Sequence, residues 1–316
     1  MPVDPFLINI SFLLLSLLLI FKAADLIVYG ISRYAKALRL SDDLIGFVVV
    51  ALAASMPEVI AGIMGLLAGK EEVLFGTILG TNMVHVALVV GTLACFARKL
   101  PLECRIIRGR VFVLWLLLML PFGLILWDGE LGRLDGAILV IAFLAYIVGL
   151  WMREGTLGRV KSRVALRTIW RDAFIFLGSL VALILAGRFL VFSSINIAAL
   201  VGIPAYFIAI TVISVSGAIP DFAVGIRSVL KGHVDIGIGD IIGSVALELL
   251  LFFGIVGLVS PIKIAVSEVF LAIIFLAISL SVIMFLVSRR SMSWRHGVAL
   301  LGLYAVFIGL EIAKLV

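Results

Sequence analysis

The chain has 316 residues, of which 64% are hydrophobic and only 14% are charged, and its formal net charge is +6. Soluble domains are about 45–50% apolar and about 25% charged, so this chain has too few polar side chains to cover a water-facing surface. The composition excludes a soluble enzyme and predicts an integral membrane protein, whose positive charge belongs to its loops and not to a nucleic-acid site.

Long apolar runs predict membrane-crossing helices rather than the strands of a barrel. Helical spans need about 20 mostly apolar residues, whereas barrel strands alternate over about 10. The runs here are continuous, as in LINISFLLLSLLLIF and VFVLWLLLMLPFGLILW. In chain order we expect ten spans, at about 6–31, 43–69, 72–97, 109–127, 135–152, 173–192, 200–229, 234–258, 264–287 and 297–315.

The basic residues alternate between the two sides of these spans. Of the 25 Lys and Arg, 19 fall in the loops that follow odd-numbered spans. The loop at 128–135, on the other side, is mainly acidic. By the positive-inside rule the odd-numbered loops are cytoplasmic and both termini lie outside. We therefore expect a multi-pass protein of the cell membrane, embedded in the lipid bilayer.

The sequence repeats itself after 163 positions, where Pro57-Glu58 falls on Pro220-Asp221 and His85 falls on Glu248. Each half holds five spans, an odd number, so the second half enters the membrane from the opposite side. We expect an all-α membrane fold of ten transmembrane helices, built as two inverted five-helix repeats. The expected parts are 1–153 with a motif region at 43–92, a basic cytoplasmic linker at 154–172, and 173–316 with a motif region at 206–254.

One span in each repeat is interrupted by proline, within AASMPEV in the first half and SGAIPDF in the second. Proline removes a backbone donor and clashes with the preceding turn, so we expect helices 2 and 7 to be broken there. The following span of each repeat carries two glycines four residues apart, which predict close packing against another helix. These glycines are Gly76, Gly80, Gly239 and Gly243.

Four carboxylates fall inside the apolar spans, at Glu58, Asp221, Asp240 and Glu248. A charge at the bilayer centre costs at least ~2.5–3.5 kcal/mol, which a purely structural role does not offset. Packed acids without a cation repel one another and retain protons. A hard cation such as Ca²⁺ instead takes about 6–8 oxygen ligands from carboxylates, hydroxyls and carbonyls. The sequence therefore predicts a cation site near the middle of the membrane.

These motifs resemble those of the calcium/cation antiporter superfamily, which includes the sodium/calcium exchangers. Members look like ten-span proteins whose two inverted repeats each carry a Gly-Thr-Ser-x-Pro-Glu and a Gly-Asn-x-x-Gly-Ser motif. Here the motifs read AASMPE and GTILGT in the first half, and SGAIPD and GDIIGS in the second. The resemblance implies a secondary active antiporter that exchanges a divalent cation, Ca²⁺ foremost, for Na⁺ or H⁺ by alternating access.

The resemblance also implies which residues bind the cation. Glu58 and Asp221 match the paired central carboxylates, and three hydroxyls match the flanking ligands. His85 and Glu248 match positions at which sodium-coupled members carry Asn and Asp. The full predicted set is Glu58, Asp221, Glu248, Asp240, His85, Ser55, Thr81, Ser244 and Thr77. Asn82, Ser214 and Ser216 are further candidates, for which helix packing is the alternative, and Ser216 could stand in for a missing hydroxyl by a one-position shift.

Three hydroxyls of the family pattern are missing, at Ala54, Gly217 and Ala218. Sodium sites are built from such oxygens, whereas His85 adds the side chain whose ordinary pKa lies nearest neutrality. Imidazole also suits softer ions than Ca²⁺. Two readings stay open, namely proton coupling through His85, Glu248 and Asp240, or a site for another divalent metal.

Two further functions compete with transport. An intramembrane enzyme would use His85 with an acid, as an acid–base pair or as metal ligands. The chain has no HExxH motif, no aspartate-rich prenyl-phosphate motif and no nucleophile with a base at helical spacing. A non-transporting family member would bind cations without flux, and the lost hydroxyls keep this alternative open. We expect no enzyme, no cofactor, inorganic cations as the partners, and a chain that can work as a monomer.

Overall fold

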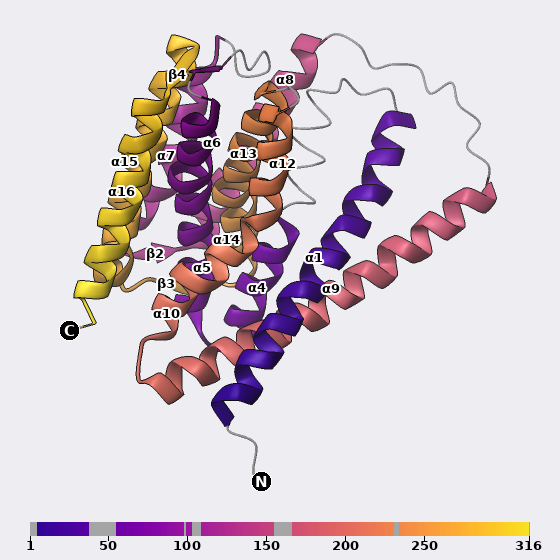
Figure 1. Cartoon of the computed structure of the whole chain (residues 1–316), viewed down its shortest axis with the longest axis vertical. Helices are drawn as coiled ribbons and strands as arrows, with labels where there is room; N and C mark the ends of the chain where they lie inside the picture. Colours follow the sequence, from indigo (N-terminus) through magenta and orange to yellow (C-terminus); the bar gives the residue numbers. More distant parts are fainter. Residues whose placement is uncertain are drawn as a thin grey trace.

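The computed structural model describes residues 5–37, 55–97, 99–102, 109–154, 166–230 and 234–315, and these are mostly helical (Figure 1). The first half contains α1 (Pro5–Ala37), α4 (Met56–Leu67), α5 (Glu71–Met83), the π-helix η2 (Val84–Val89), α6 (Val90–Ala97), α7 (Val111–Asp128) and α8 (Arg133–Glu154). Ala53 and Ala54 of the first predicted motif lie outside the described residues.

The second half begins with a long helix, α9 (Leu166–Val201). It is followed by α10 (Ala205–Ile208), the π-helix η3 (Ala209–Ile213), α11 (Ser214–Gly217), α12 (Ile219–Leu230), α13 (Val234–Ala246), the π-helix η4 (Leu247–Phe252), α14 (Phe253–Val259), α15 (Val266–Arg289) and α16 (Trp294–Ala313). Because α9 begins at Leu166, it takes up the last part of the expected linker at 154–172, and residues 155–165 lie outside the described ranges.

Helix boundaries recur 163 residues along the chain. The helix α4 runs from 56 to 67 and α12 from 219 to 230, so both ends differ by 163. The same spacing separates both ends of α5 from those of α13, and both ends of η2 from those of η4. The regularity that the sequence carries in its Gly, Pro and acidic residues is therefore also present in the backbone.

Short antiparallel strand pairs join loops of one half to loops of the other. Strand β1 (Lys99–Pro101) pairs with β4 (Ser291–Ser293), and β2 (Glu130–Leu131) pairs with β3 (Ile262–Lys263). Residue 99 corresponds to 262 and residue 130 to 293 at the spacing of 163, so the two pairs are equivalent to each other. Figure 1 shows β4 at the upper end of the molecule and β2 and β3 toward the lower end.

Six helical segments among the described residues are long and apolar enough to cross a membrane: Glu71–Ala97, Val111–Asp128, Arg133–Leu150, Gly237–Val259, Val266–Arg289 and Trp294–Ala313. Two of them are central, because 94% of the apolar window of Glu71–Ala97 and 83% of that of Gly237–Val259 is buried. The corresponding share is 28% for Val111–Asp128 and 22% for Trp294–Ala313. Apolar side chains that remain exposed on the outer helices suit contact with lipid.

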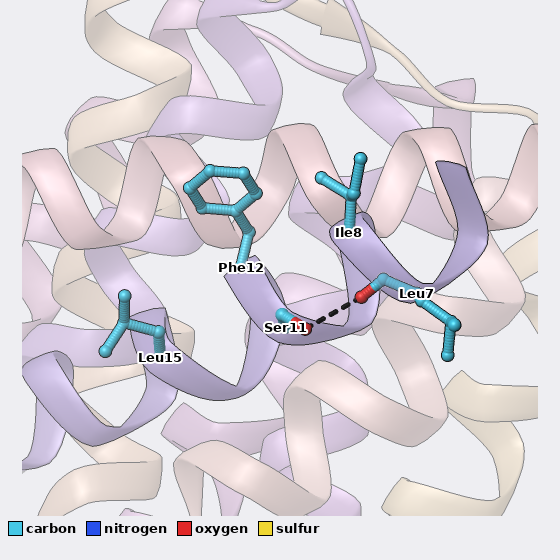
Figure 2. A pocket seen from close by; sticks show the side chains of 5 residues that line it. All are labelled: Leu7, Ile8, Ser11, Phe12 and Leu15. Atoms are coloured by element: carbon cyan, nitrogen blue, oxygen red, sulfur yellow. Dashed lines mark hydrogen bonds between the residues drawn. The ribbon is translucent and has the colours of Figure 1, made fainter. Parts of the chain in front are cut away.

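The helices α1 and α9 lie side by side along one flank of the molecule (Figure 1). The rings of Phe12 and Phe189 stack between them with centroids 6.0 Å apart. Figure 2 shows a shallow groove on α1 that is lined by Leu7, Ile8, Ser11, Phe12 and Leu15. The Ser11 hydroxyl donates a 2.8 Å hydrogen bond to the Leu7 carbonyl. The one polar side chain of this apolar groove is therefore paired within its own helix.

A helix interruption is present before Pro220, as the sequence predicts. The helix α11 ends at Gly217 and α12 begins at Ile219, with Ala218 between them at φ −73° and ψ −6°. In the first half α4 begins after Ser55, which has nearly the same conformation at φ −77° and ψ −2°. Each proline therefore stands in the first turn of a helix, where a missing N–H breaks no helical hydrogen bond.

Candidate cation site

The predicted metal-binding side chains are all buried in the interior formed by α4, α5, η2, α12, α13 and η4. None is more than 2% exposed, and the set is Ser55, Glu58, Thr77, Thr81, His85, Asp221, Asp240, Ser244 and Glu248. The short helices α4 and α12 place Glu58 and Asp221 in their first turns. The π-helical turns η2 and η4 each carry an ionisable residue at their second position, His85 and Glu248. Single π-helical turns occur often at functional sites.

One side of this interior is organised by a contact between His85 and Asp221. The distance between His85 Nε2 and Asp221 Oδ2 is 2.7 Å. The contact joins the two halves of the chain, because His85 belongs to η2 and Asp221 to α12. Asp240 lies close enough to interact electrostatically with both residues. On this side an imidazole already faces the carboxylate that the sequence assigns to the cation.

The other side is organised by Asn82, Glu58 and Glu248. Asn82 Nδ2 donates a 2.9 Å hydrogen bond to Glu248 Oε2 and a 2.7 Å bond to the carbonyl of Ile78. Ser55 lies next to Glu248. Glu58 and Glu248, from opposite halves of the chain, are both fully buried carboxylates of this interior.

Many oxygens in this interior have no hydrogen-bond partner among the described residues. They are both carboxylate oxygens of Glu58, Asp221 and Asp240, Asn82 Oδ1, Glu248 Oε1, and the hydroxyls of Ser55, Thr77, Thr81 and Ser244. An unpaired buried polar group costs about 1–3 kcal/mol, and more when it is charged, so proteins rarely retain several in one place. Such a collection of acceptors suits a bound cation or transferred protons.

The described acids do not form a closed cage of metal ligands. Among the described residues, no three His, Cys, Asp or Glu side chains are spaced as a ready-made metal cluster. A cation held by one pair of carboxylates would need uncharged oxygens to complete its coordination, and hydroxyl and amide oxygens of that kind lie in the same interior.

Gly217 provides the space that Glu58 occupies. A Cβ atom added at Gly217 would lie only 2.9 Å from both Cγ and Cδ of Glu58. A cavity of about 10 Å³ lies beside this contact, and its lining includes Leu17 of α1 and Leu190 of α9. That volume is comparable to one water-sized probe. The family pattern has a larger side chain at the position of Gly217. Its absence here leaves space that the Glu58 side chain occupies.

Glycines bring α5 against the segment α10–η3, as the spacing of Gly76 and Gly80 predicts. A Cβ atom at Gly76 would lie 2.9 Å from the Tyr206 carbonyl oxygen, and one at Gly80 would lie 2.7 Å from that of Ile210. Ser214 donates a 2.7 Å hydrogen bond to Ala209 and also lies 3.1 Å from the Thr77 carbonyl oxygen. Ser214 therefore links its own segment to α5 at this close approach.

Two residues at this site have roles that the sequence analysis did not give them. The sequence left Asn82 between cation binding and helix packing and did not indicate its contact with Glu248, to which its Nδ2 donates a hydrogen bond. Asn82 precedes His85 by three positions, nearly one helical turn, and this spacing alone is a signal that the two share a helix face. Gly217 was expected only as the loss of a hydroxyl, and no local sequence signal indicates that Glu58 takes its place.

Known proteins similar to this chain are membrane proteins and exchangers. The family described as "Sodium/calcium exchanger protein" matches residues 8–152 and 172–313. Inner membrane protein YrbG of Escherichia coli (strain K12) is 30% identical over 267 residues, which cover 81% of this chain and 81% of that protein. Sodium/calcium exchanger MaX1 of Methanosarcina acetivorans is 24% identical, with 95% of this chain and 97% of that protein covered.

Solved structures share the fold. The crystal structure of the H⁺/Ca²⁺ exchanger CAX gives a TM-score of 0.79 at 17% identity, covering 96% of this chain and 87% of that one. A structure of the sodium-calcium exchanger NCX_Mj gives a TM-score of 0.69 at 18% identity, covering 95% of this chain and 97% of that one. At these identities the comparison establishes a common fold over nearly the whole chain.

Proposed function

Because this chain belongs to the sodium/calcium exchanger protein family, we propose that it is a secondary active antiporter that exchanges a divalent cation, Ca²⁺ foremost, for H⁺ or Na⁺ by alternating access. The observation that carries the proposal is the buried group of carboxylates whose oxygens lack hydrogen-bond partners among the described residues. Similar proteins include a sodium/calcium exchanger and an H⁺/Ca²⁺ exchanger, which supports Ca²⁺ as the cargo. The chain is a transporter rather than an enzyme.

The proposed architecture is ten membrane spans in two inverted repeats, 1–153 and 173–316, joined by the basic linker at 154–172. The recurrence of helix boundaries after 163 residues supports the repeat. The equivalent strand pairs toward opposite ends of the molecule support the inversion. Four shorter apolar helices accompany the six long segments and support the number of spans: Phe6–Ile20, Glu58–Leu67, Leu185–Val201 and Ala205–Gly217.

The proposed orientation places both termini outside and the basic loops in the cytoplasm. Its support is the position of 19 of the 25 Lys and Arg in loops after odd-numbered spans. A monomer suffices for function in this proposal, because both halves of the site come from one chain and contact each other through His85 and Asp221.

Charge compensation in the membrane provides the coupling between the two ions. Several ionised carboxylates without a counter-charge are costly at the membrane centre, so the protein reorients only when a divalent cation or protons compensate them. An ionised site that holds neither a divalent cation nor protons therefore cannot change the side of the membrane to which it is open. Each direction of transport then requires its own ion. This is the physical condition for exchange instead of leak.

The contact between His85 and Asp221 favours H⁺ as the counter-ion. Imidazole changes its charge near neutral pH. Because His85 Nε2 lies 2.7 Å from Asp221 Oδ2, that charge acts directly on the Asp221 carboxylate. Three hydroxyls of the family pattern are missing, at Ala54, Gly217 and Ala218, which removes oxygens of the kind that sodium sites use.

Reconstitution into proteoliposomes tests the proposal. Uptake of ⁴⁵Ca²⁺ is followed under an imposed pH gradient, an imposed Na⁺ gradient, or neither. We expect uptake that depends on the pH gradient and collapses when a protonophore removes it. Uptake driven only by the Na⁺ gradient would show that the counter-ion is Na⁺ and not H⁺. An absence of gradient-driven flux of any divalent cation would overturn the proposed function.

A further inference from the structure

A cavity separate from the cation site lies where several helices begin or end. Its volume is about 640 Å³, and none of the predicted cation ligands lines it. The membrane-crossing segments Glu71–Ala97, Val266–Arg289 and Trp294–Ala313 each begin or end beside it. Figure 1 shows α10 and the C-terminus toward the lower end of the molecule. Because apolar helices begin and end at the bilayer surface, the cavity lies at the level of the lipid headgroups.

The starts of α5 and α15 and the end of α16 contribute charged side chains to the lining. The ammonium of Lys70 lies 3.8 Å from a carboxylate oxygen of Glu72. Lys314 Nζ donates a 3.1 Å hydrogen bond to Glu311 Oε1 and lies 3.4 Å from the carbonyl oxygen of Glu268. All five residues line the cavity, so three acids stand against two lysines. The charged lining therefore has both signs and an excess of negative charge.

The lining that α9 and α10 contribute is mainly apolar. It includes Ile195 and Ala199 of α9 and Phe207 of α10. Apolar surface of this kind is stabilised by contact with a hydrocarbon chain and not by contact with a small charged solute. The cavity therefore suits an amphiphile, which has a charged part and an apolar part.

Two polar side chains of the lining are almost completely buried. Glu311 is 2% exposed and Tyr206 is 7% exposed. The Tyr206 hydroxyl has no hydrogen-bond partner among the described residues, although a buried tyrosine hydroxyl usually finds one. The carboxylates of Glu268 and Glu311 lie close enough to act on it electrostatically. A positively charged group with N–H donors would compensate the acids and give the hydroxyl a partner.

We propose that this cavity binds a phospholipid with a primary ammonium headgroup. The ammonium interacts with Glu268, Glu311 and Tyr206, the phosphate lies toward the two lysines, and an acyl chain follows α9. An anionic lipid would bring its phosphate to an excess of acids without an ammonium to compensate them. A choline lipid has a quaternary ammonium, which carries no N–H donor. The proposal concerns a site that the proposed function does not use, so it does not depend on which ion is transported.

Native mass spectrometry of the purified full-length protein tests the proposal with lipids that share dioleoyl chains. Their headgroups are ethanolamine, N-methylethanolamine, N,N-dimethylethanolamine, choline and glycerol. We expect the ethanolamine lipid to bind about tenfold more tightly than the choline lipid, which corresponds to about 1.4 kcal/mol, and each added methyl group to weaken binding. Equal binding of the ethanolamine and choline lipids, or tighter binding of the anionic glycerol lipid, would overturn the proposal.

Substitutions of matched acids test whether the lipid binds in this cavity. Glu311→Gln removes the charge of the buried acid, so we expect it to weaken binding of the ethanolamine lipid by about tenfold. Glu71→Gln is the control, because Glu71 is an exposed acid at the start of α5 that does not line the cavity. Unchanged binding in Glu311→Gln, or equal weakening in both variants, would overturn the proposal.

A bulky side chain tests the apolar lining. Ala199 is exposed on α9, so Ala199→Phe fills the cavity without entering the packed core. Leu200→Phe is the control, because Leu200 is the next exposed residue of α9 and does not line the cavity. We expect Ala199→Phe to weaken lipid binding by about tenfold and Leu200→Phe to leave it unchanged. Equal binding by the two variants would overturn the proposed position of the chain.

Water-soluble phosphoethanolamine separates the headgroup from the acyl chains. We expect it to displace the lipid only at far higher concentrations, because it cannot cover the apolar lining. Displacement at concentrations equal to that of the lipid would overturn the assignment to a lipid. Melting temperatures in detergent check that each variant is folded, and the comparison of lipids on the wild type decides the matter if a variant is not. A wild type that transports Ca²⁺ without distinguishing these lipids refutes this inference alone.

Discussion

The segments α5–η2 and α13–η4 have the same backbone plan and different chemistry. Both change from α-helix to π-helix at equivalent positions, after Met83 and after Ala246. Their side chains at equivalent positions differ, however, since Thr77, Asn82 and His85 of the first segment correspond to Asp240, Val245 and Glu248 of the second. A fold with two similar halves therefore encloses a site whose two sides are not alike.

This difference has an electrostatic reason. If both segments carried carboxylates at these positions, Glu58 and Asp221 would be joined by four further acids rather than two, more than one divalent cation can balance. Thr77 and His85 in the first segment reduce that excess, because a hydroxyl and an imidazole add no negative charge. The comparison teaches that the duplicated backbone sets where side chains meet, whereas the charge of the cargo limits which side chains can meet there.

The largest expected effect comes from two of the buried carboxylates. Glu58→Gln and Glu248→Gln each remove a charged ligand, so we expect each to lower ⁴⁵Ca²⁺ flux in proteoliposomes by about 100-fold or more. Glu268→Gln is the control, because Glu268 is exposed at the start of α15. Flux within about twofold of the wild type in Glu58→Gln would contradict a role of this carboxylate as a cation ligand.

Gly217→Ala narrows the space that Glu58 occupies. The new Cβ would lie 2.9 Å from Cγ and Cδ of Glu58, so the carboxylate must move away from its position. We expect Ca²⁺ flux to fall by about tenfold, in line with the sensitivity of metal sites to displaced ligands. Gly123→Ala in α7 is the matched control, because its new Cβ meets no described atom within 4 Å. Equal flux in the two variants would show that this space is not needed.

Gly80→Ala affects the packing on which the first half depends. Its Cβ would lie 2.7 Å from the carbonyl oxygen and 2.8 Å from the Cα of Ile210, and backbone atoms move less readily than side-chain ends. We expect a loss of about 1–3 kcal/mol in stability, measured as a lower melting temperature in detergent. Gly302→Ala in α16 should leave the melting temperature unchanged or raised, since the described residues leave space there. An unchanged melting temperature for Gly80→Ala would contradict the close approach.

His85→Asn is expected to change the pH dependence more than the maximal rate. A protonated imidazole adds positive charge beside Asp221, and this charge disfavours a divalent cation in the same interior. Wild-type Ca²⁺ flux should therefore decline as the pH falls, and the variant should be less inhibited, by about two- to threefold at acidic pH. Identical pH profiles would remove His85 from the coupling mechanism.

Local rules predict much of this fold from the sequence. Pro57 and Pro220 indicate where helices restart, because proline acts on its own turn. Gly76 and Gly80 indicate a close helix crossing, because nothing larger fits there. The burial of Glu58, Asp221 and Glu248 follows from their place in apolar runs, since helices of that composition lie in the membrane or the core.

Pairing within the site depends on long-range geometry, and the sequence did not predict it. A π-helical turn adds one residue per turn, so the α-helical spacing that relates side chains fails across η2 and η4. The contacts of His85 with Asp221 and of Asn82 with Glu248 also depend on how two distant halves are rotated against each other. The residues next to Gly217 in the sequence do not indicate its role, because the side chain that fills the space beside Gly217 belongs to the distant residue Glu58.

The position of a heavy divalent cation tests the central claim most directly. A crystal structure of the protein grown with Sr²⁺ would locate the ion by its anomalous scattering. We predict a peak inside the interior that holds the buried carboxylates, at roughly 2.3–2.6 Å or slightly more from carboxylate oxygens that include those of Glu58. A peak outside this interior, or no peak in a protein that transports the ion, would contradict the account.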